Sequence, residues 1–198
     1  MATKITYIRP SSDVSVGHSL QGLTTAAACM AEETADDDST YITQSVTSTT
    51  ASTVTTTINM SGTFSIGSAR DFVVDKVTLC IRAEKTSSTS GIISDSAKSS
   101  GTAECTINGT TSSGSISIGG NYAVSEISVN TSSFTTAGEY SFPVTISTTG
   151  AMGTGSKDTE YEIRVTQAYL KIEYRLFNNL TVIQGGTGTI SGHTPTGL

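Results

Sequence analysis

The chain has 198 residues and a formal net charge of -6 at pH 7. Because a negatively charged surface repels phosphate backbones, this charge argues against a nucleic-acid-binding role. No stretch approaches the roughly 20 apolar residues of a membrane span, and the first residues lack the apolar region of a signal peptide. The sequence therefore predicts a protein that is made and folded in a cytoplasm and has no membrane partner.

Serine and threonine make up a third of the chain, whereas hydrophobic residues reach 35% and charged residues only 14%. Thr, Val, Ile and Tyr alternate over long stretches, which favours strands with small polar outer faces. A chain of this length buries roughly 70% of its unfolded surface, so its core does not need disulfides. We expect buried free thiols at Cys29, Cys80 and Cys105, with a Cys80–Cys105 bridge as the alternative.

The N-terminal region is predicted to contain one strand and one helix. Residues 4–9 form a strand candidate that Pro10 is expected to end, and residues 11–13 form a turn. Over residues 19–33 the apolar side chains recur at steps of three and four, which predicts one face of a short helix. These apolar residues are Leu20, Leu23, Ala27 and Met30.

Strands dominate the centre of the chain. A run over 41–59 places Val54 and Ile58 on one face, and residues 72–83 give the clearest alternation. Residues 84–101 are predicted to be a loop. Further strands are predicted at 102–108, 115–118, 126–130 and 139–147, with Pro143 indicating an edge strand or a bulge in the last.

The stretch over 160–176 changes phase once. Tyr161 and Val165 have one parity, whereas Ala168 and Leu170 have the other. A slip of one residue moves every following side chain to the opposite face of a strand. The pattern therefore predicts a bulge, or a bend between sheets, near Gln167.

Residues 177–198 contain five glycines and few charges, and we expect an arm that extends beyond the domain formed by residues 1–176. A solvated tail and an arm docked on a neighbouring subunit both fit this composition. The residues predicted to bind a partner are the apolar ones: Phe177, Leu180, Val182, Ile183 and Ile190.

The fold class predicted from these elements is all-β, a two-sheet antiparallel β-sandwich with one short N-terminal helix. Periodicity alone does not separate a jelly roll from an immunoglobulin-like Greek key.

The opening of the chain resembles that of jelly-roll virion proteins encoded by tailed bacteriophages. Residues 7–15 give a Pro-Ser-Ser-Asp-Val-Ser turn, an Ala-rich helix follows, and residues 32–42 give an acidic loop before an aromatic residue. The later strand order over 73–83 and 168–175 is similar too. The chain departs from the pattern at Gly17-His18, where such proteins often continue Gly-Gly-Trp, and it has no Trp.

This resemblance implies a jelly-roll fold and a structural particle protein: a capsid decoration or head-fibre module, or a piece of the tail. It does not imply an enzyme, and we expect no catalytic residues. It implies other virion proteins as partners, either the major capsid protein or tail components. We expect a homo-oligomer, with a trimer as the working assumption.

The acidic loop is a candidate metal site. Its carboxylates, with Asp13 nearby, could offer oxygens to Ca²⁺. The loop lacks EF-hand spacing, and capping of local N–H groups explains Asp and Ser here more simply. We therefore expect no metal and no cofactor, and name as weak candidates Asp36, Asp37 and Asp38, beside Glu32 and Glu33.

Catalytic and sugar-binding chemistry have weaker signals. His18 and His193 are the only histidines and lie far apart in the sequence. A nucleophile needs a base and an orienting group within reach, and nothing in the pattern supplies them. Tyr122, Tyr161 and Tyr169 are candidates for a sugar-stacking surface, with packing as the default interpretation.

Three functions therefore remain open. The first is a non-enzymatic virion protein, most simply a capsid decoration or auxiliary protein on the head exterior. The second is a tail or fibre module that binds a receptor or carbohydrate. The third is a bacterial surface adhesin domain, against which the missing export signal argues.

Overall fold

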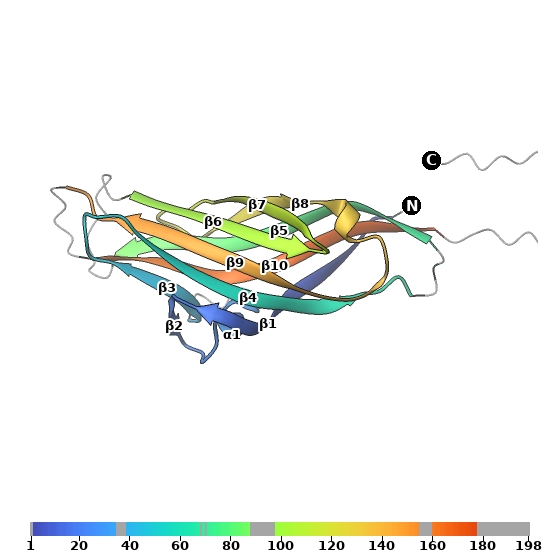
Figure 1. Ribbon diagram of the computed structural model, residues 1–198, viewed down its shortest axis with the longest axis horizontal. Helices are drawn as coiled ribbons and strands as arrows, with labels where there is room; N and C mark the ends of the chain where they lie inside the picture. The colour runs from blue at the N-terminus through green and yellow to red at the C-terminus, as the bar shows by residue number, and fades with distance from the viewer. Residues whose placement is uncertain are drawn as a thin grey trace, which may run out of the picture.

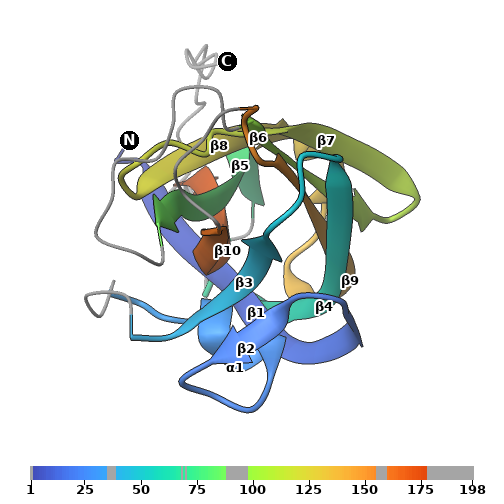
Figure 2. The same cartoon turned by 90° about the vertical axis from the view of Figure 1, so that its left-hand side faces the viewer.

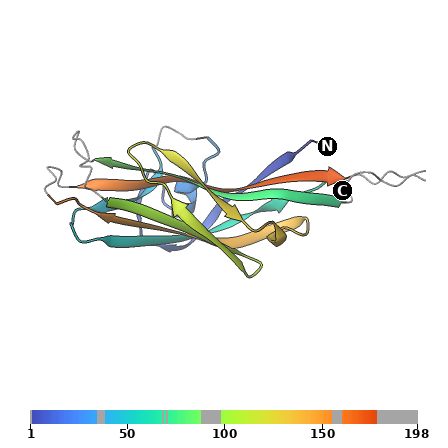
Figure 3. The same cartoon turned by 90° about the horizontal axis from the view of Figure 1, so that it is seen from above.

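The structure is a computed structural model that describes residues 2–34, 39–67, 69, 71–87, 98–154 and 160–177. Strands account for most of these residues, and the molecule is elongated along them (Figures 1 and 3). The elements are β1 (Lys4–Val16), β2 (Ser19–Gln21), α1 (Ala26–Met30), β3 (Tyr41–Val46), β4 (Ser52–Phe64), β5 (Asp71–Ser87), β6 (Lys98–Ile107), β7 (Thr110–Ile116), β8 (Ala123–Val129), η1 (Thr131–Ser133), β9 (Gly138–Ala151) and β10 (Tyr161–Phe177).

The chain folds as a jelly roll. Antiparallel pairs nest inside one another, β3 with β10, β4 with β9, β5 with β8 and β6 with β7, as in a long hairpin that has been rolled up. Sheet A has the order β2-β3-β10-β5-β8, and sheet B has the order β1-β4-β9-β6-β7. The predicted fold class, an all-β two-sheet antiparallel sandwich of jelly-roll type, is confirmed, and Figure 2 shows the two layers end-on.

Strand β1 belongs to both sheets. Its first half, Lys4 to Ile8, pairs with β10 in sheet A, and the half from Arg9 to Val16 pairs with β4 in sheet B. The prediction that Pro10 ends this strand is wrong. A strand that changes sheets breaks its ladder once, and Pro10, which has no N–H to donate, lies at that point.

The helix predicted over residues 19–33 is much shorter than expected. Only Ala26–Met30 is helical, whereas Ser19–Gln21 is a strand paired with β3. Gly22 has a φ of +84°, which no right-handed helix allows, and the Thr25 side chain accepts a hydrogen bond from the helix as its N-cap. Packed against β1, β3 and β10, α1 covers the side where β1 crosses (Figure 2).

The central strands keep their predicted faces but not their predicted ends. The run over 41–59 divides into β3 and β4, and the Val54 to Met60 face of β4 turns inward as expected. The loop predicted over 84–101 is too long at both ends, because β5 continues to Ser87 and β6 starts at Lys98. Residues 88–97 lie outside the described part of the chain.

The phase change predicted near Gln167 is confirmed as a bulge. The register between β10 and β5 shifts between Val165 and Gln167, while the strand stays in sheet A throughout. Residues on both sides of the bulge therefore keep their apolar side chains in the core.

The prediction that Pro143 marks an edge strand or a bulge is wrong, because Pro143 lies in an interior strand. β9 lies between β4 and β6, and its register with β4 is continuous. However, the ladder to β6 ends at the Cys105–Val144 pair, one residue before Pro143. At Pro143 β9 is paired on one flank only, which is where a sheet tolerates proline.

The core lies between the two sheets. Phe64 from sheet B meets Phe72 and Tyr174 from sheet A edge to face, with centroid separations of 5.1 Å and 4.9 Å. Each fully buried Leu, Ile or Phe contributes about 1.5–3 kcal/mol to folding. Fully enclosed members include Ile8, Ile42, Ile58, Met60, Leu79, Ile81, Ile146, Leu170 and Ile172.

Candidate functional site

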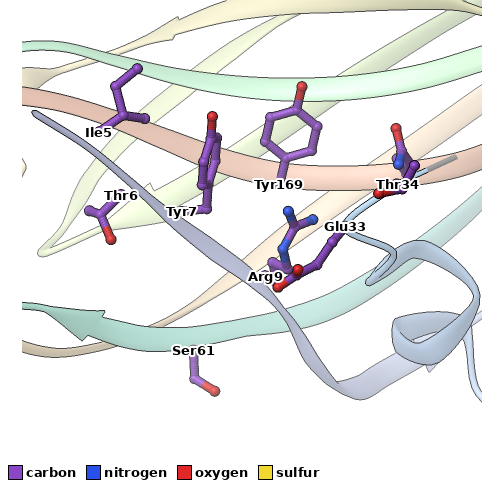
Figure 4. A pocket seen from close by; sticks show the side chains of 9 residues that line it. Ile5, Thr6, Tyr7, Arg9, Glu33, Thr34, Ser61 and Tyr169 are labelled. Atoms are coloured by element: carbon purple, nitrogen blue, oxygen red, sulfur yellow. The ribbon is translucent and has the colours of Figure 1, made fainter.

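A groove of about 860 Å³ lies where β1 leaves sheet A. Its walls come from β1, β10 and the segment that follows α1, with one residue from β4 (Figure 4). The groove is lined by Ile5, Thr6, Tyr7, Arg9, Glu33, Thr34, Ser61, Gln167 and Tyr169.

Two tyrosine rings and one guanidinium form the centre of the groove. The rings of Tyr7 and Tyr169 meet edge to face, with centroids 5.8 Å apart and planes at 76°. The Arg9 guanidinium carbon is 5.6 Å from the first centroid and 5.5 Å from the second. Cation–π attraction at these distances holds the three groups together.

Strand periodicity places these side chains on the outer face. On β1, Ile8 points into the core, so its neighbours Tyr7 and Arg9 point outward. On β10 the bulge decides the orientation. Without the one-residue bulge after Val165, the side chain of Tyr169 would point into the core. The bulge instead turns this side chain toward the groove.

The segment after α1 is held in place by side-chain hydrogen bonds to its backbone. Arg9 donates from Nη1 to the Glu32 carbonyl oxygen at 2.6 Å, and Gln167 donates from Nε2 to the same oxygen at 3.4 Å. These two bonds place the exposed Glu33 and Thr34 at the rim of the groove. The groove thus presents donors and a carboxylate around a pair of aromatic rings.

The acidic candidates that the structure describes, Asp13, Glu32 and Glu33, are not gathered into a metal site. In the described part of the chain, no group of three or more His, Cys, Asp or Glu side chains is placed to hold an ion. Asp13 accepts hydrogen bonds from the N–H groups of Ala26 and Ala27 at 3.1 Å and 2.7 Å, so it caps α1. Asp36, Asp37 and Asp38 lie outside the described residues.

His18 is buried and forms hydrogen bonds with side chains in the interior. Its Nδ1 lies 2.8 Å from the Thr56 hydroxyl, and its Nε2 lies 2.8 Å from the Thr148 hydroxyl. Burial lowers the pKa of His18 to about 4. Both nitrogens are occupied, so this ring is not available as a ligand. His193 lies outside the described residues.

All three cysteines are free and buried, which confirms the prediction and excludes the Cys80–Cys105 bridge. Burial raises the pKa of the Cys105 thiol to about 11, and it raises the pKa values of Cys29 and Cys80 as well. Only the thiolate is a good nucleophile, and a raised pKa keeps each thiol protonated. We therefore assign these three side chains to core packing.

The predicted sugar-stacking tyrosines are not brought together. Tyr161 is 1% exposed, and its hydroxyl donates to the Lys98 carbonyl oxygen. Tyr122 lies 4.3 Å from the Arg82 guanidinium, away from the groove. Only Tyr169 lines the groove, and its aromatic partner Tyr7 was missed. The signal for Tyr7 was its parity opposite to Ile8 in the first strand.

The predicted partner-binding residues fall mostly beyond the described chain. Phe177 ends β10 and pairs with Asp71 of β5. The other four, Leu180, Val182, Ile183 and Ile190, lie outside the described residues, as does the arm over 178–198.

A second feature is the outer surface of β4 and β9, where hydroxyl groups pair across the strands. Thr53 meets Thr149 at 2.7 Å, and Asn59 donates to Ser141 at 2.8 Å. Two further pairs, Thr55–Ser147 and Thr57–Thr145, have separations of 2.9 Å and 3.0 Å. We name this surface the hydroxyl face: Thr53, Thr55, Thr57, Asn59, Ser141, Thr145, Ser147 and Thr149.

No family model matches the chain, and no curated protein matches it. Among solved structures the chain is similar to TmCBM61 in complex with beta-1,4-galactotriose, with a TM-score of 0.38 and 9% identity over 85% of this chain and 86% of that chain. A likeness at this level carries no argument about ligands. Within the described residues, no helix is long and apolar enough to cross a membrane.

Proposed function

We propose that this chain is a non-enzymatic structural protein of a bacteriophage virion. In this role it decorates the head exterior, binds other virion proteins through its surface and uses no metal or cofactor. The observation that carries the proposal is the hydroxyl face, a row of short, uncharged, mutually bonded side chains on the outside of sheet B.

Such a surface is well suited to being covered by another protein. Its hydroxyls already satisfy one another, so covering them leaves few polar groups without a partner. No charge on this row has to be desolvated, which would cost far more. Short side chains also lose less rotamer entropy on binding than Lys or Glu would.

The opening motif that resembles phage virion proteins supports the same proposal. Its Asp13 joins β1 to α1, and its Pro10 marks the point where β1 changes sheets. These residues build the fold, and a motif that builds a fold is informative about the kind of protein it belongs to.

Particles of the encoding phage provide the test. The protein is expected at a fixed stoichiometry in purified virions, and its absence from their protein profile would refute the proposal. Detection in isolated tails but not in heads would instead support the tail or fibre module.

A charge on the hydroxyl face tests the surface itself. Thr55→Lys is expected to fold normally yet be incorporated poorly, because the new ammonium group must be desolvated at the contact. Ser128→Lys, also at an exposed strand position but on sheet A, is the matched control and should be incorporated like the wild type. Equal incorporation of the two variants would exclude the hydroxyl face as the contact.

A further inference from the structure

The groove presents an aromatic surface that the core does not require. Tyr7 is 48% exposed, and the Tyr169 ring supports it edge to face. A tyrosine ring offers a large rigid apolar face with few rotatable bonds, so it binds a flat ligand surface with little loss of entropy. Figure 4 shows both rings rising on the same side of the sheet as Arg9.

Arg9 is held in a defined position in the groove. One of its N–H groups is bound to the Glu32 carbonyl oxygen, and its guanidinium lies against both rings. Arginine carries five N–H donors in a fixed plane, so further donors remain for oxygen atoms of a ligand. Glu33 at the rim supplies acceptors, and the amide of Gln167, a buried residue that lines the groove, supplies both kinds of group.

From this arrangement we propose that the groove binds a neutral oligosaccharide. A sugar ring has an apolar C–H face that stacks on Tyr7, and hydroxyl groups that both donate and accept hydrogen bonds. The volume of about 860 Å³ lies within the range of small-ligand sites. A particle protein held by protein contacts needs no such site, so this inference goes beyond the proposed function.

Other ligand classes fit the groove less well. An anion would meet one guanidinium beside the Glu33 carboxylate, on a chain of net charge -6. A purely apolar ligand would leave the donors around the rings without partners, which costs binding free energy.

The test uses the full chain and defined probes. Saturation-transfer NMR with tetrasaccharides of glucose, galactose, mannose and N-acetylglucosamine, after a screen on an array of neutral bacterial glycans, detects binding even at millimolar Kd. We expect at least one neutral glycan to bind the wild type. Tyr7→Ala should weaken that binding about tenfold or more, and Tyr7→Phe should retain most of it.

Tyr41→Ala is the matched control. Tyr41 also lies under an arginine, with Arg164 at 4.5 Å from its ring, but it is outside the groove. This variant should bind as the wild type does. No binding to any neutral glycan, or equal weakening by Tyr7→Ala and Tyr41→Ala, overturns the proposal.

Incorporation into particles separates this proposal from the proposed function. If Tyr7→Ala loses glycan binding but enters virions normally, the groove is a sugar site independent of assembly. If Tyr7→Ala fails to enter virions and no glycan binds the wild type, the groove is a protein contact and the sugar proposal is wrong. If glycans bind but the protein is absent from virions, only the virion role is refuted.

Discussion

His18 illustrates how one residue is kept neutral by its neighbours. The Thr148 hydroxyl donates to Gln44, so it must accept from Nε2–H of the ring. The Thr56 hydroxyl accepts from the backbone N–H groups of Gly17 and His18, and therefore donates to Nδ1. The neutral tautomer satisfies every partner, whereas a second ring proton would find no acceptor.

This arrangement makes stability depend on pH. The folded pKa of His18 is lowered from 6.5 to about 4, so between these values the unfolded chain takes up a proton that the folded chain does not. The free energy of unfolding should therefore fall as the pH drops from about 6.5 to about 4, by up to roughly 3 kcal/mol from this group.

Urea denaturation at several pH values, together with NMR titration of His18, measures this dependence. His18→Gln should lose this part of the dependence, leaving the contribution of the carboxylates. An identical pH dependence in the two proteins, or an NMR pKa near 6.5, would show that burial does not hold the ring neutral.

At the scale of elements, the contact between β1 and α1 depends on hydrogen bonds between residues that are not adjacent in the sequence. Asp13 lies in the bulged part of β1, and its carboxylate accepts from the first two N–H groups of α1. These N–H groups have no partner within the helix itself. The helix has only five residues, so its position depends on such contacts more than on its own propensity.

Asp13→Ala should destabilise the fold by about 1–3 kcal/mol, because it leaves two partly buried N–H groups without acceptors. The midpoint of urea unfolding measures the loss. Asp71→Ala, at the exposed start of β5, serves as control and should change stability by less than about 0.5 kcal/mol. Equal effects of the two substitutions would mean that the cap contributes nothing.

At the scale of the whole molecule, nearly all pairings join distant parts of the chain. β3 pairs with β10, and β1 pairs with β10 as well, so the two ends of the described chain meet in one sheet. The chain must lose the conformational entropy of closing a long loop before such contacts can stabilise it. Topologies of this kind are therefore slow to fold.

Refolding should therefore take about milliseconds to seconds or longer, rather than microseconds. Stopped-flow tyrosine fluorescence suits the measurement, because the chain contains seven Tyr and no Trp. Completion within microseconds would contradict the expectation that the nested pairs control the rate.

The sequence by itself determined most of the strands, though not their ends, together with their inward faces and the bulge at Gln167, because alternation is a property of near neighbours along the chain. It overstated the helix, since the spacing of Leu20 and Leu23 fitted a helix although Gly22 between them does not. Only the tertiary structure decided which distant residues meet: Tyr7 with Tyr169 in the groove, and His18 with Thr148 in the core. Such contacts depend on the order in which the strands pair, and the local alternation of side chains does not encode that order.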